Sequence, residues 1–346
     1  MKNIIPFIVN YSPIKKLAIV PFEKKPDKIY KSFELQYIDG EPYGNGYRIV
    51  AYRKDSYVDV YDDISLQFQE NEKFNVAEKG LNRHVQVAIK KAYLEKQNNC
   101  EYISFSFKDL ENRKIDFYIK EFSSKKSIPM NLLAPIGYGS KNPNFLPLFF
   151  MYNFDFIRKK YTQIKCKIED KKIKIDKFSM PMNMQFRYYA RYSNQCELLE
   201  FANTDSLSFV EVDLDNNSYI DKNIEYIFEE SNSLSKIIVH LEDGKIEINF
   251  SPCFDMNKDT KGIFKICPKK EMGYLEGIYE INRDQDKIYI KLVPQNGWNA
   301  VPNSFITKLI LNKNSIFCKW CKNYEYIEEI DVSKRLVRAK WNNKCR

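Results

Sequence analysis

Hydrophobic residues alternate with polar ones along most of this chain, and short polar turns interrupt the pattern at regular intervals. Successive side chains of a β-strand point to opposite faces, so a period of two indicates antiparallel strands with one buried face. Residues 103–119 contain two apolar rows around a polar turn: Ile103, Phe105 and Phe107, then Ile115, Phe117 and Ile119. The same arrangement returns at 162–178 and 236–250, and it predicts a hairpin each time.

The length of the chain indicates how many domains it forms. Its 346 residues exceed the usual size of one hydrophobic core, and 44% of them are hydrophobic, which is ample to fill two. An antiparallel protein of this size must protect its sheet edges, and closure into barrels is a common solution. The sequence therefore predicts an all-β fold of two antiparallel β-barrels or sandwiches in tandem, over residues 1–160 and 161–346.

Two further segments contribute to the predicted secondary structure. Residues 85–97 (VQVAIKKAYLEKQ) begin with residues that favour a strand and continue with residues that favour a helix, so both structures stay open. Residues 305–321 (FITKLILNKNSIFCKWC) predict further strands around a polar turn.

The apolar stretch 129–154 joins the two predicted domains and contains four prolines and one charge, Lys141. One interpretation is a buried crossover that packs against both halves. The other is that its side chains cover a ligand cavity at the domain junction, where pockets are frequent. The residues assigned to that cavity are Tyr138, Asn142, Phe145 and Phe149.

Targeting and membrane signals are missing from the pattern. No small-residue cleavage site follows the short apolar run near the N-terminus, and no uncharged stretch approaches the roughly 18 residues needed to span a bilayer. We therefore expect a cytoplasmic protein with no transmembrane segment. In that compartment the eight cysteines are expected to be reduced thiols.

Metal and cofactor motifs are equally sparse. The two histidines, His84 and His240, lie far apart, so no HExxH motif can be written. Cys318 and Cys321 form a lone CxxC pair, whereas a structural zinc site needs four ligands. The glycine pairs at 44–46 and 137–139 precede no clear helix and indicate turns rather than phosphate loops. We predict no metal site and no cofactor.

The net charge of +9 is distributed unevenly. Residues 197–259 hold 15 acids and 4 bases, whereas residues 334–346 hold six bases and no acid. The basic tail is either a solvated chain end or a nucleic-acid contact. Because the acidic block would repel phosphate, we expect no nucleic-acid partner.

The hairpin from Phe33 to Asp63 supplies the main candidate site. With a two-residue turn at Lys54-Asp55, the strands before and after the turn acquire one apolar face and one mixed face that could line a pocket. The expected mixed face consists of Arg48, Val50, Tyr52, Tyr57, Asp59 and Tyr61. The expected apolar face consists of Tyr47, Ile49, Ala51, Val58 and Val60.

Asp59 is unusual because it lies between Val58 and Val60 in a predicted strand. Aspartate disfavours strands, and burial raises the pKa of a carboxyl group unless a cation pairs with it. Arg48, on the same expected face, could be that cation in a structural ion pair. The alternative is that Asp59 is a catalytic acid, oriented by Tyr57 or Tyr61.

Residues 180–192 (MPMNMQFRYYARY) alternate as well. Arg187, Tyr189 and Arg191 share one face, on which two guanidinium groups could hold a carboxylate or phosphate by charge-assisted hydrogen bonds. The alternative is a solvated face whose arginines pair with acids on neighbouring strands.

The sequence also resembles a known family. Tyr37-Ile-Asp39-Gly40, followed by Gly46-Tyr-Arg-Ile-Val-Ala-Tyr52, is similar to the opening of the carotenoid 1,2-hydratase (hydroxyneurosporene synthase) and tocopherol cyclase-like proteins, and Arg83-His84-Val85 falls in a compatible order. The resemblance covers roughly the first 140 residues. It implies tandem lipocalin-like β-barrels with an apolar cavity.

The chain departs from that family at two places. Glu34-Leu35 stands where the family has paired tryptophans, and Ser140 occupies the position of the acid with which the family protonates a double bond. Serine is no such acid at neutral pH. The resemblance therefore supports the barrel and its cavity more than the hydratase reaction.

Three functions follow from these observations. The first is a cytoplasmic binding protein for a hydrophobic, lipid- or isoprenoid-like molecule, with Arg48 or the pair Arg187 and Arg191 meeting its polar head group. The second is a hydratase- or cyclase-like enzyme that uses Asp59 as a general acid on an apolar substrate. The third is carbohydrate binding by a β-sandwich through exposed aromatics such as Trp298 and Trp320; against it stands the interpretation in which Trp298 packs beside Pro294 and Pro302 in a core loop.

Overall fold

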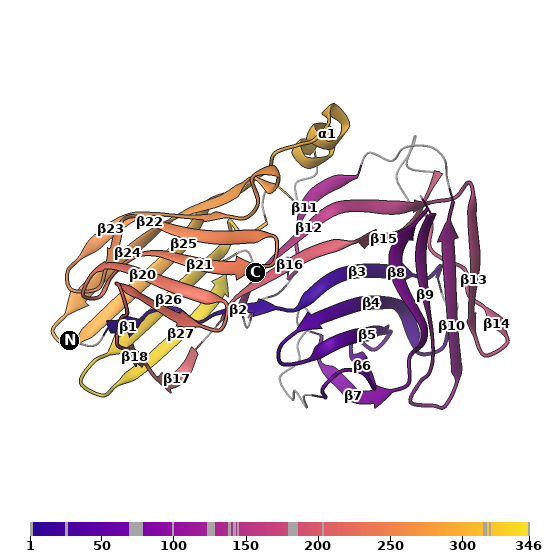
Figure 1. Cartoon of the computed structure of the whole chain (residues 1–346), viewed down its shortest axis with the longest axis horizontal. Coiled ribbons are helices and arrows are strands. Elements are labelled where there is room, and N and C mark those ends of the chain that lie inside the picture. The colour runs from indigo at the N-terminus through magenta and orange to yellow at the C-terminus, as the bar shows by residue number, and fades with distance from the viewer. Residues whose placement is uncertain are drawn as a thin grey trace. The chain divides into compact units, whose positions relative to one another are not determined.

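The computed structural model (Figure 1) describes residues 3–24, 27–68, 79–98, 100–122, 129–137, 140, 143, 145–178, 186–202, 204–313, 317 and 320–344. Strands make up most of these residues, which confirms the predicted all-β class. They form two compact units that are interleaved in the chain. Unit 1 consists of Met1–Ser12, Asn131–Phe150 and Leu198–Arg346, and unit 2 of Pro13–Met130 and Met151–Glu197.

The two units therefore differ from a single division at residue 160. Strands pair with partners that are distant in sequence: β1 (Asn3–Ile5) with β18 (Val210–Val212), and β3 (Ile14–Pro21) with β15 (Arg187–Ser193). The chain passes between the units within β12 (Phe145–Arg158) and β16 (Gln195–Ala202). Alternation along the chain identifies strands, but it does not specify which distant strands pair.

Two sheets form most of unit 2. Within unit 2, the strands of the first, in spatial order, are β12, β15, β3, β4 (Tyr30–Gly40), β5 (Gly44–Arg53), β6 (Val58–Asp63) and β7 (Leu81–Val87). Those of the second are β14 (Lys171–Lys172), β13 (Thr162–Ile168), β10 (Lys114–Glu121), β9 (Cys100–Lys108) and β8 (Lys90–Gln97). Residues 85–87 thus belong to β7 and residues 90–97 to β8, which settles the choice that the sequence left open.

A shared hydrophobic core joins the two sheets of unit 2. Phe33 of the first sheet contacts Phe105 and Phe117 of the second, with ring centroids 5.8 and 5.2 Å away. Phe105 and Phe117 lie opposite each other in the β9–β10 pair and stack at 5.1 Å. The hairpin predicted at 103–119 is confirmed, since its two apolar rows are those that enter this core.

Unit 1 contains one long antiparallel sheet. Its strands, in spatial order, are β17 (Thr204–Ser208), β27 (Leu336–Asn343), β26 (Tyr324–Asp331), β25 (Lys287–Asn299), β24 (Tyr274–Asp284), β23 (Thr260–Cys267), β22 (Gly244–Asp255), β21 (Ser233–Leu241), β20 (Ile224–Glu230) and β19 (Ser218–Asp221). Shorter elements are β1, β18, β2 (Val9–Ser12), β11 (Met130–Ala134) and the 3₁₀ helix η2 (Lys270–Met272). From β19 to β27 the spatial order follows the sequence, as a succession of hairpins predicts.

One prediction about unit 1 is wrong. Residues 305–313 form helix α1 (Phe305–Lys313), where strands were expected. The hydroxyl of Ser304 accepts a hydrogen bond from the backbone N–H of Thr307 at 3.1 Å, and this capping satisfies a donor that the first helical turn leaves free.

The tryptophans of unit 1 are part of its interior. Trp298 is 9% exposed and donates its indole N–H to the carbonyl of Met272, whereas Trp320 is 2% exposed and donates to the carbonyl of Ile136. Exposed tryptophans at these positions, which carbohydrate binding would need, are therefore excluded.

The turn of the candidate hairpin is longer than expected, and this reverses the predicted faces. Arg53 donates its N–H to the carbonyl of Tyr57, so residues 54–56 form a three-residue turn, with Ser56 at φ 70°. Each residue of β6 consequently pairs one position away from its expected partner. Because a shift of one residue turns every side chain to the other face, Asp59 and Tyr61 join Ile49 and Ala51.

Candidate functional site

A pocket of about 480 Å³ lies at one end of the first sheet of unit 2. Strands β4 and β7 begin there, β5 ends there, and the turn between β9 and β10 approaches from the second sheet. The lining residues are Ile29, Tyr30, Arg53, Asn82, Arg83, Val85, Leu110 and Glu111. The volume falls within the usual range for small-molecule sites.

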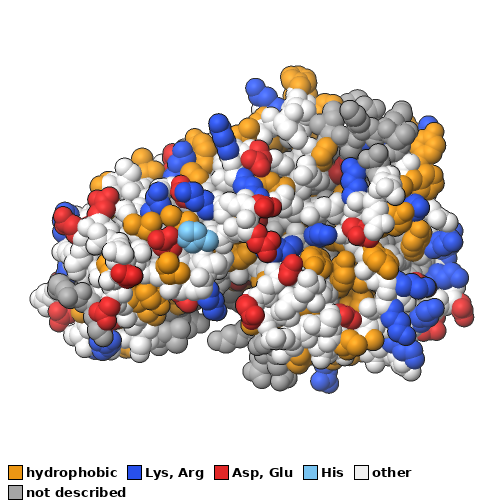
Figure 2. Space-filling view, viewed as in Figure 1, with side chains coloured by type: hydrophobic (Ala, Val, Ile, Leu, Met, Phe, Trp, Pro, Cys, Tyr) orange, Lys and Arg blue, Asp and Glu red, His pale blue; other side chains and the backbone are white. Residues whose placement is uncertain are grey.

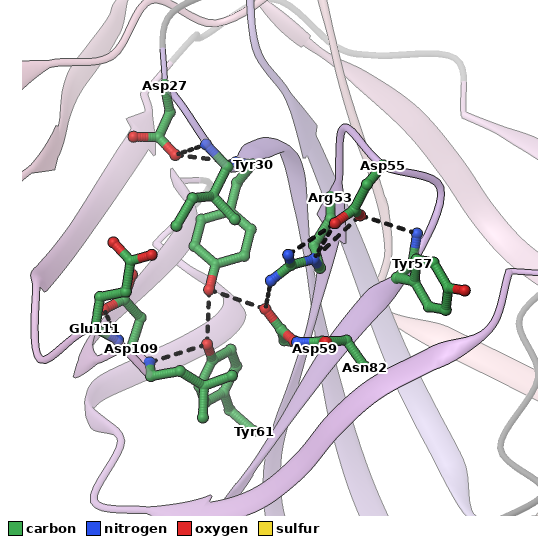
Figure 3. Close-up of polar contacts among 12 residues, drawn as sticks. Asp27, Tyr30, Arg53, Asp55, Tyr57, Asp59, Tyr61, Asn82, Asp109 and Glu111 are labelled. Carbon is green, nitrogen blue, oxygen red and sulfur yellow. Dashed lines mark hydrogen bonds and ion pairs between the residues drawn. The ribbon is translucent and has the colours of Figure 1, made fainter.

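A buried carboxylate organises the polar wall of this pocket (Figure 3). Asp59 is fully buried and accepts hydrogen bonds from the Tyr30 hydroxyl at 3.1 Å and the Asn82 amide at 2.5 Å. The guanidinium of Arg53 also contacts it, at 3.1 Å. Both carboxylate oxygens of Asp59 are thus engaged by these three side chains, all of which line the pocket.

Two hydrogen bonds, in each of which the donor can be assigned, hold the Tyr30 hydroxyl in place. A carboxylate only accepts, so Tyr30 donates to Asp59, and Tyr61 in turn donates to Tyr30 across 2.7 Å. The Tyr61 hydroxyl accepts the backbone N–H of Leu110 at 3.3 Å. Burial raises the pKa of both tyrosines, which keeps them neutral donors at physiological pH.

A second cluster holds the two loops beside the pocket. The guanidinium of Arg113 contacts Asp27 at 2.9 Å and Asp109 at 2.7 Å, and Asp27 also accepts the backbone N–H groups of Ile29 and Tyr30. Burial alone would raise the pKa of Asp27, but these hydrogen bonds and the Arg113 charge lower it. The cluster therefore joins the start of β4 to the β9–β10 turn.

The two arginines of the pocket differ in what they contact. All three nitrogens of the Arg53 guanidinium contact acids, since Asp55 binds Nε and Nη2 and Asp59 binds Nη1. Arg83 is exposed, and within the part of the chain that the structure describes no acid or acceptor pairs with its guanidinium. Glu111 lies on the same pocket and contacts Arg113 at 3.6 Å. Arg83 is therefore the group whose charge is available to a ligand.

The predicted pairing of Arg48 with Asp59 is wrong. Arg48 forms a two-pronged ion pair with Asp62, at 2.6 and 2.9 Å, and His84 contacts the same carboxylate at 2.9 Å. Arg48 is 6% exposed and Asp62 is fully buried. Arg48 thus belongs to a buried network on the opposite face of β5 and β6, because the three-residue turn moves Asp59 to the core face.

Tyr52 belongs to the same face as Arg48. Its hydroxyl donates to Glu34 at 2.7 Å, and Gln36 donates to the other oxygen of that carboxylate at 2.6 Å. Burial raises the pKa of Glu34, against the opposing effect of these hydrogen bonds. Tyr52 therefore satisfies a buried carboxyl group and does not line the pocket.

Strand β15 carries the other predicted arginines. Arg187 donates to the carbonyl of Phe156 at 2.8 Å and lies 3.7 Å from Asp155, whereas Arg191 lies over the ring of Tyr189 at 4.8 Å. Tyr189 also stacks on Phe156. These contacts agree with the alternative in which the face pairs with protein groups rather than with a ligand.

The remaining predicted residues lie apart from the network or outside the described residues. Tyr57 is 50% exposed, and its backbone N–H donates a hydrogen bond to the Asp55 carboxylate. Its ring points away from Asp59 in Figure 3. Tyr138, Asn142 and Cys318 fall outside the described residues. Ser140 is described, and it is a buried residue of unit 1.

Sequence reasoning missed Tyr30, Asn82 and the ligand-accessible Arg83. Tyr30 and Asn82 lie outside the hairpin on which the prediction concentrated, and no local motif connects them to Asp59. Arg83 enters the sequence prediction only through Arg83-His84-Val85, yet it alternates with Val85 on β7 and lies opposite Asp59 in the parallel β6–β7 pair. That alternation is the one signal that could have placed it on this face.

The described residues and the comparisons with known proteins assign no class to the protein. Among the described residues, no group of three or more His, Cys, Asp or Glu side chains could hold a metal ion, and no helix is long and apolar enough to span a membrane. No family model, curated protein or solved structure matches the chain. The resemblance to the carotenoid 1,2-hydratase family therefore stays a prediction.

Proposed function

We propose that unit 2 binds a small molecule with an apolar body and an anionic head group in the pocket beside Asp59. Arg83 carries this proposal, because it is an exposed cation on the pocket wall with no acid partner among the described residues. Ile29, Val85 and Leu110 offer apolar surface next to it. Such a wall suits a carboxylate or phosphate attached to a hydrocarbon portion.

The geometry supports binding better than acid catalysis by Asp59. A general acid must come within hydrogen-bonding distance of its substrate. Asp59 does not line the pocket, and Tyr30, Asn82 and Arg53 engage both of its oxygens. Its role in the proposal is to hold Tyr30 and Arg53 in place, so it is a positioning residue.

The proposal can be tested with decanoate and decanol as matched probes in titration calorimetry. Decanoate is expected to bind more tightly than decanol. Arg83→Met is expected to lower the affinity for decanoate at least tenfold and to leave the affinity for decanol unchanged. A hydrogen-bonded charge contributes about 1.5–3 kcal/mol, which corresponds to that factor. Leu110→Gln is expected to weaken both probes, because it removes apolar surface that both would cover.

Lys90→Met provides the matched control, since Lys90 is an exposed cation of β8 that does not line the pocket. It should leave both affinities unchanged. Equal affinities for decanoate and decanol, or an Arg83→Met protein that still binds decanoate normally, would contradict the proposed head-group contact. Absence of binding by either probe would contradict the proposed pocket.

A further inference from the structure

Helix α1 of unit 1 presents large apolar side chains to solvent. Phe305 is 74% exposed, Ile306 59% and Leu309 38%, and Val301 just before the helix is 51% exposed. Phe305 and Leu309 are four residues apart and so lie on one face of the helix. These four residues are called the α1 patch below.

The orientation of the helix is fixed by its other face. Thr307 and Leu311, also four residues apart, are 4% and 5% exposed and attach the helix to unit 1. The Thr307 hydroxyl donates to the Asn303 side chain at 2.9 Å, which further holds the first turn. The α1 patch is therefore turned outward because the opposite face is anchored, and Figure 1 shows α1 beyond the ends of the strands of unit 1.

The charge of the segment that contains the α1 patch is of one sign. Residues 292–324 contain four lysines and no acid. Lys308 lies within the helix and Lys322 follows it, and both side chains are exposed without an acid partner among the residues that the structure describes. Apolar and basic side chains occur together at the top of Figure 2, where Figure 1 places α1.

We propose that the α1 patch docks on an anionic lipid surface. A helix with exposed aromatic and aliphatic residues flanked by lysines lies in the plane of a membrane interface, where apolar side chains enter the lipid and lysines meet acidic head groups. The patch comprises four residues, whereas stable protein interfaces use roughly 20 to 30 on each side. The charge and size of the patch therefore favour a bilayer over a second protein.

Vesicle flotation with the full chain tests this inference. The protein is expected to float with vesicles of phosphatidylcholine and phosphatidylserine at 3:1, and much less with phosphatidylcholine alone. The double variant Phe305→Ser/Leu309→Ser should reduce binding at least tenfold. Lys308→Gln should reduce it about fivefold, the factor that one lysine near an acidic surface contributes. A higher salt concentration should also weaken vesicle binding by the wild type, because salt screens the attraction between lysines and acidic head groups.

The control is Ile220→Ser, which removes a side chain of unit 1 that is 58% exposed and lies on β19. It should bind vesicles like the wild type. The proposal is overturned if the wild type does not float with either vesicle, or if the double variant floats as well as the wild type. It is also overturned if light scattering shows an oligomer that the double variant abolishes, because the patch would then be a contact between copies. The outcome is independent of the ligand pocket in unit 2.

Discussion

Replacing Asp62 by alanine is expected to destabilise unit 2 by about 3–5 kcal/mol, the usual effect of leaving one member of a buried ion pair without its partner. Arg48 is 6% exposed and its two hydrogen bonds to Asp62 replace the water it loses on folding. Without the carboxylate, that buried guanidinium loses the bonds which offset its desolvation. Denaturant unfolding of the variant and the wild type measures the difference.

The double variant Arg48→Met/Asp62→Leu separates the ion pair from its individual charges. It should recover most of the loss, because apolar residues of similar size often replace a buried pair at little cost. The exposed pair Arg335–Glu211 is the control, and breaking it with Glu211→Ala should cost less than about 1 kcal/mol. If Asp62→Ala lowered the free energy of unfolding by less than about 1 kcal/mol as well, the buried pair would behave like a solvent-exposed one.

The contribution of Asp62 should also depend on pH. Burial alone would raise the pKa of Asp62, but the hydrogen bonds from Arg48 and His84 lower it below the ordinary value of 3.8. The unfolded state then binds the proton first as pH falls. The stabilisation is therefore complete above pH 3.8 and is lost as pH falls through the lower pKa of the folded state.

A second large effect is expected at Glu328, in the interior of unit 1. Glu328 is 1% exposed and shares the inward face of β26 with Tyr326. Burial raises its pKa well above the ordinary value of 4.5. Above pH 4.5 the unfolded state loses a proton that the folded state keeps, so the free energy of unfolding falls by about 1.4 kcal/mol per pH unit up to the folded pKa.

Glu328→Gln should abolish this slope, because an amide does not titrate. As pH rises above 4.5, the free energy of unfolding of the variant should therefore increase relative to that of the wild type, until the pH reaches the folded pKa of Glu328. Denaturant unfolding across this pH range provides the measurement. Glu101 and Glu200, whose pKa burial raises to about 7, contribute equally to both proteins and cancel in the difference.

Glu329→Gln is the matched control for Glu328→Gln. Glu329 is the next residue of β26, points to the other face and contacts Lys287 at 2.7 Å. Its replacement should change stability by less than about 1 kcal/mol and leave the slope in place. Parallel curves for the wild type and Glu328→Gln would mean that the Glu328 carboxyl group ionises in the folded state as readily as in the unfolded one.

Local pattern explains which predictions about strands succeeded. The rows Ile103–Phe107 and Ile115–Ile119 are close in sequence and separated by a polar turn, so their pairing follows from alternation alone. The sequence predicts strands at helix α1 because its apolar residues also fit strands, whereas the capping by Ser304 favours a helix. Strand pairs such as β3 with β15 join residues about 170 positions apart, and nothing in the local sequence specifies them.

The candidate site illustrates a finer limit. Asp59 was correctly singled out as a strand-embedded acid in need of a cation, and that cation is Arg53 rather than Arg48. The error came from one residue in a turn, since Ser56 adopts a positive φ that its sequence context does not demand. A shift of one position exchanged the faces of β6 and, with them, the partners of every polar residue on it.

The sequence by itself determined the all-β class, the local hairpins and the unusual character of Asp59, because each depends on neighbours within a few residues. Only the tertiary structure decided that the units interleave and which face of β6 is buried. It also decided that Tyr30, Asn82 and the β9–β10 turn lie near Asp59. Those features depend on which distant strands pair and in which register. Such choices are made by the packing of the shared core rather than by the alternation of any single strand.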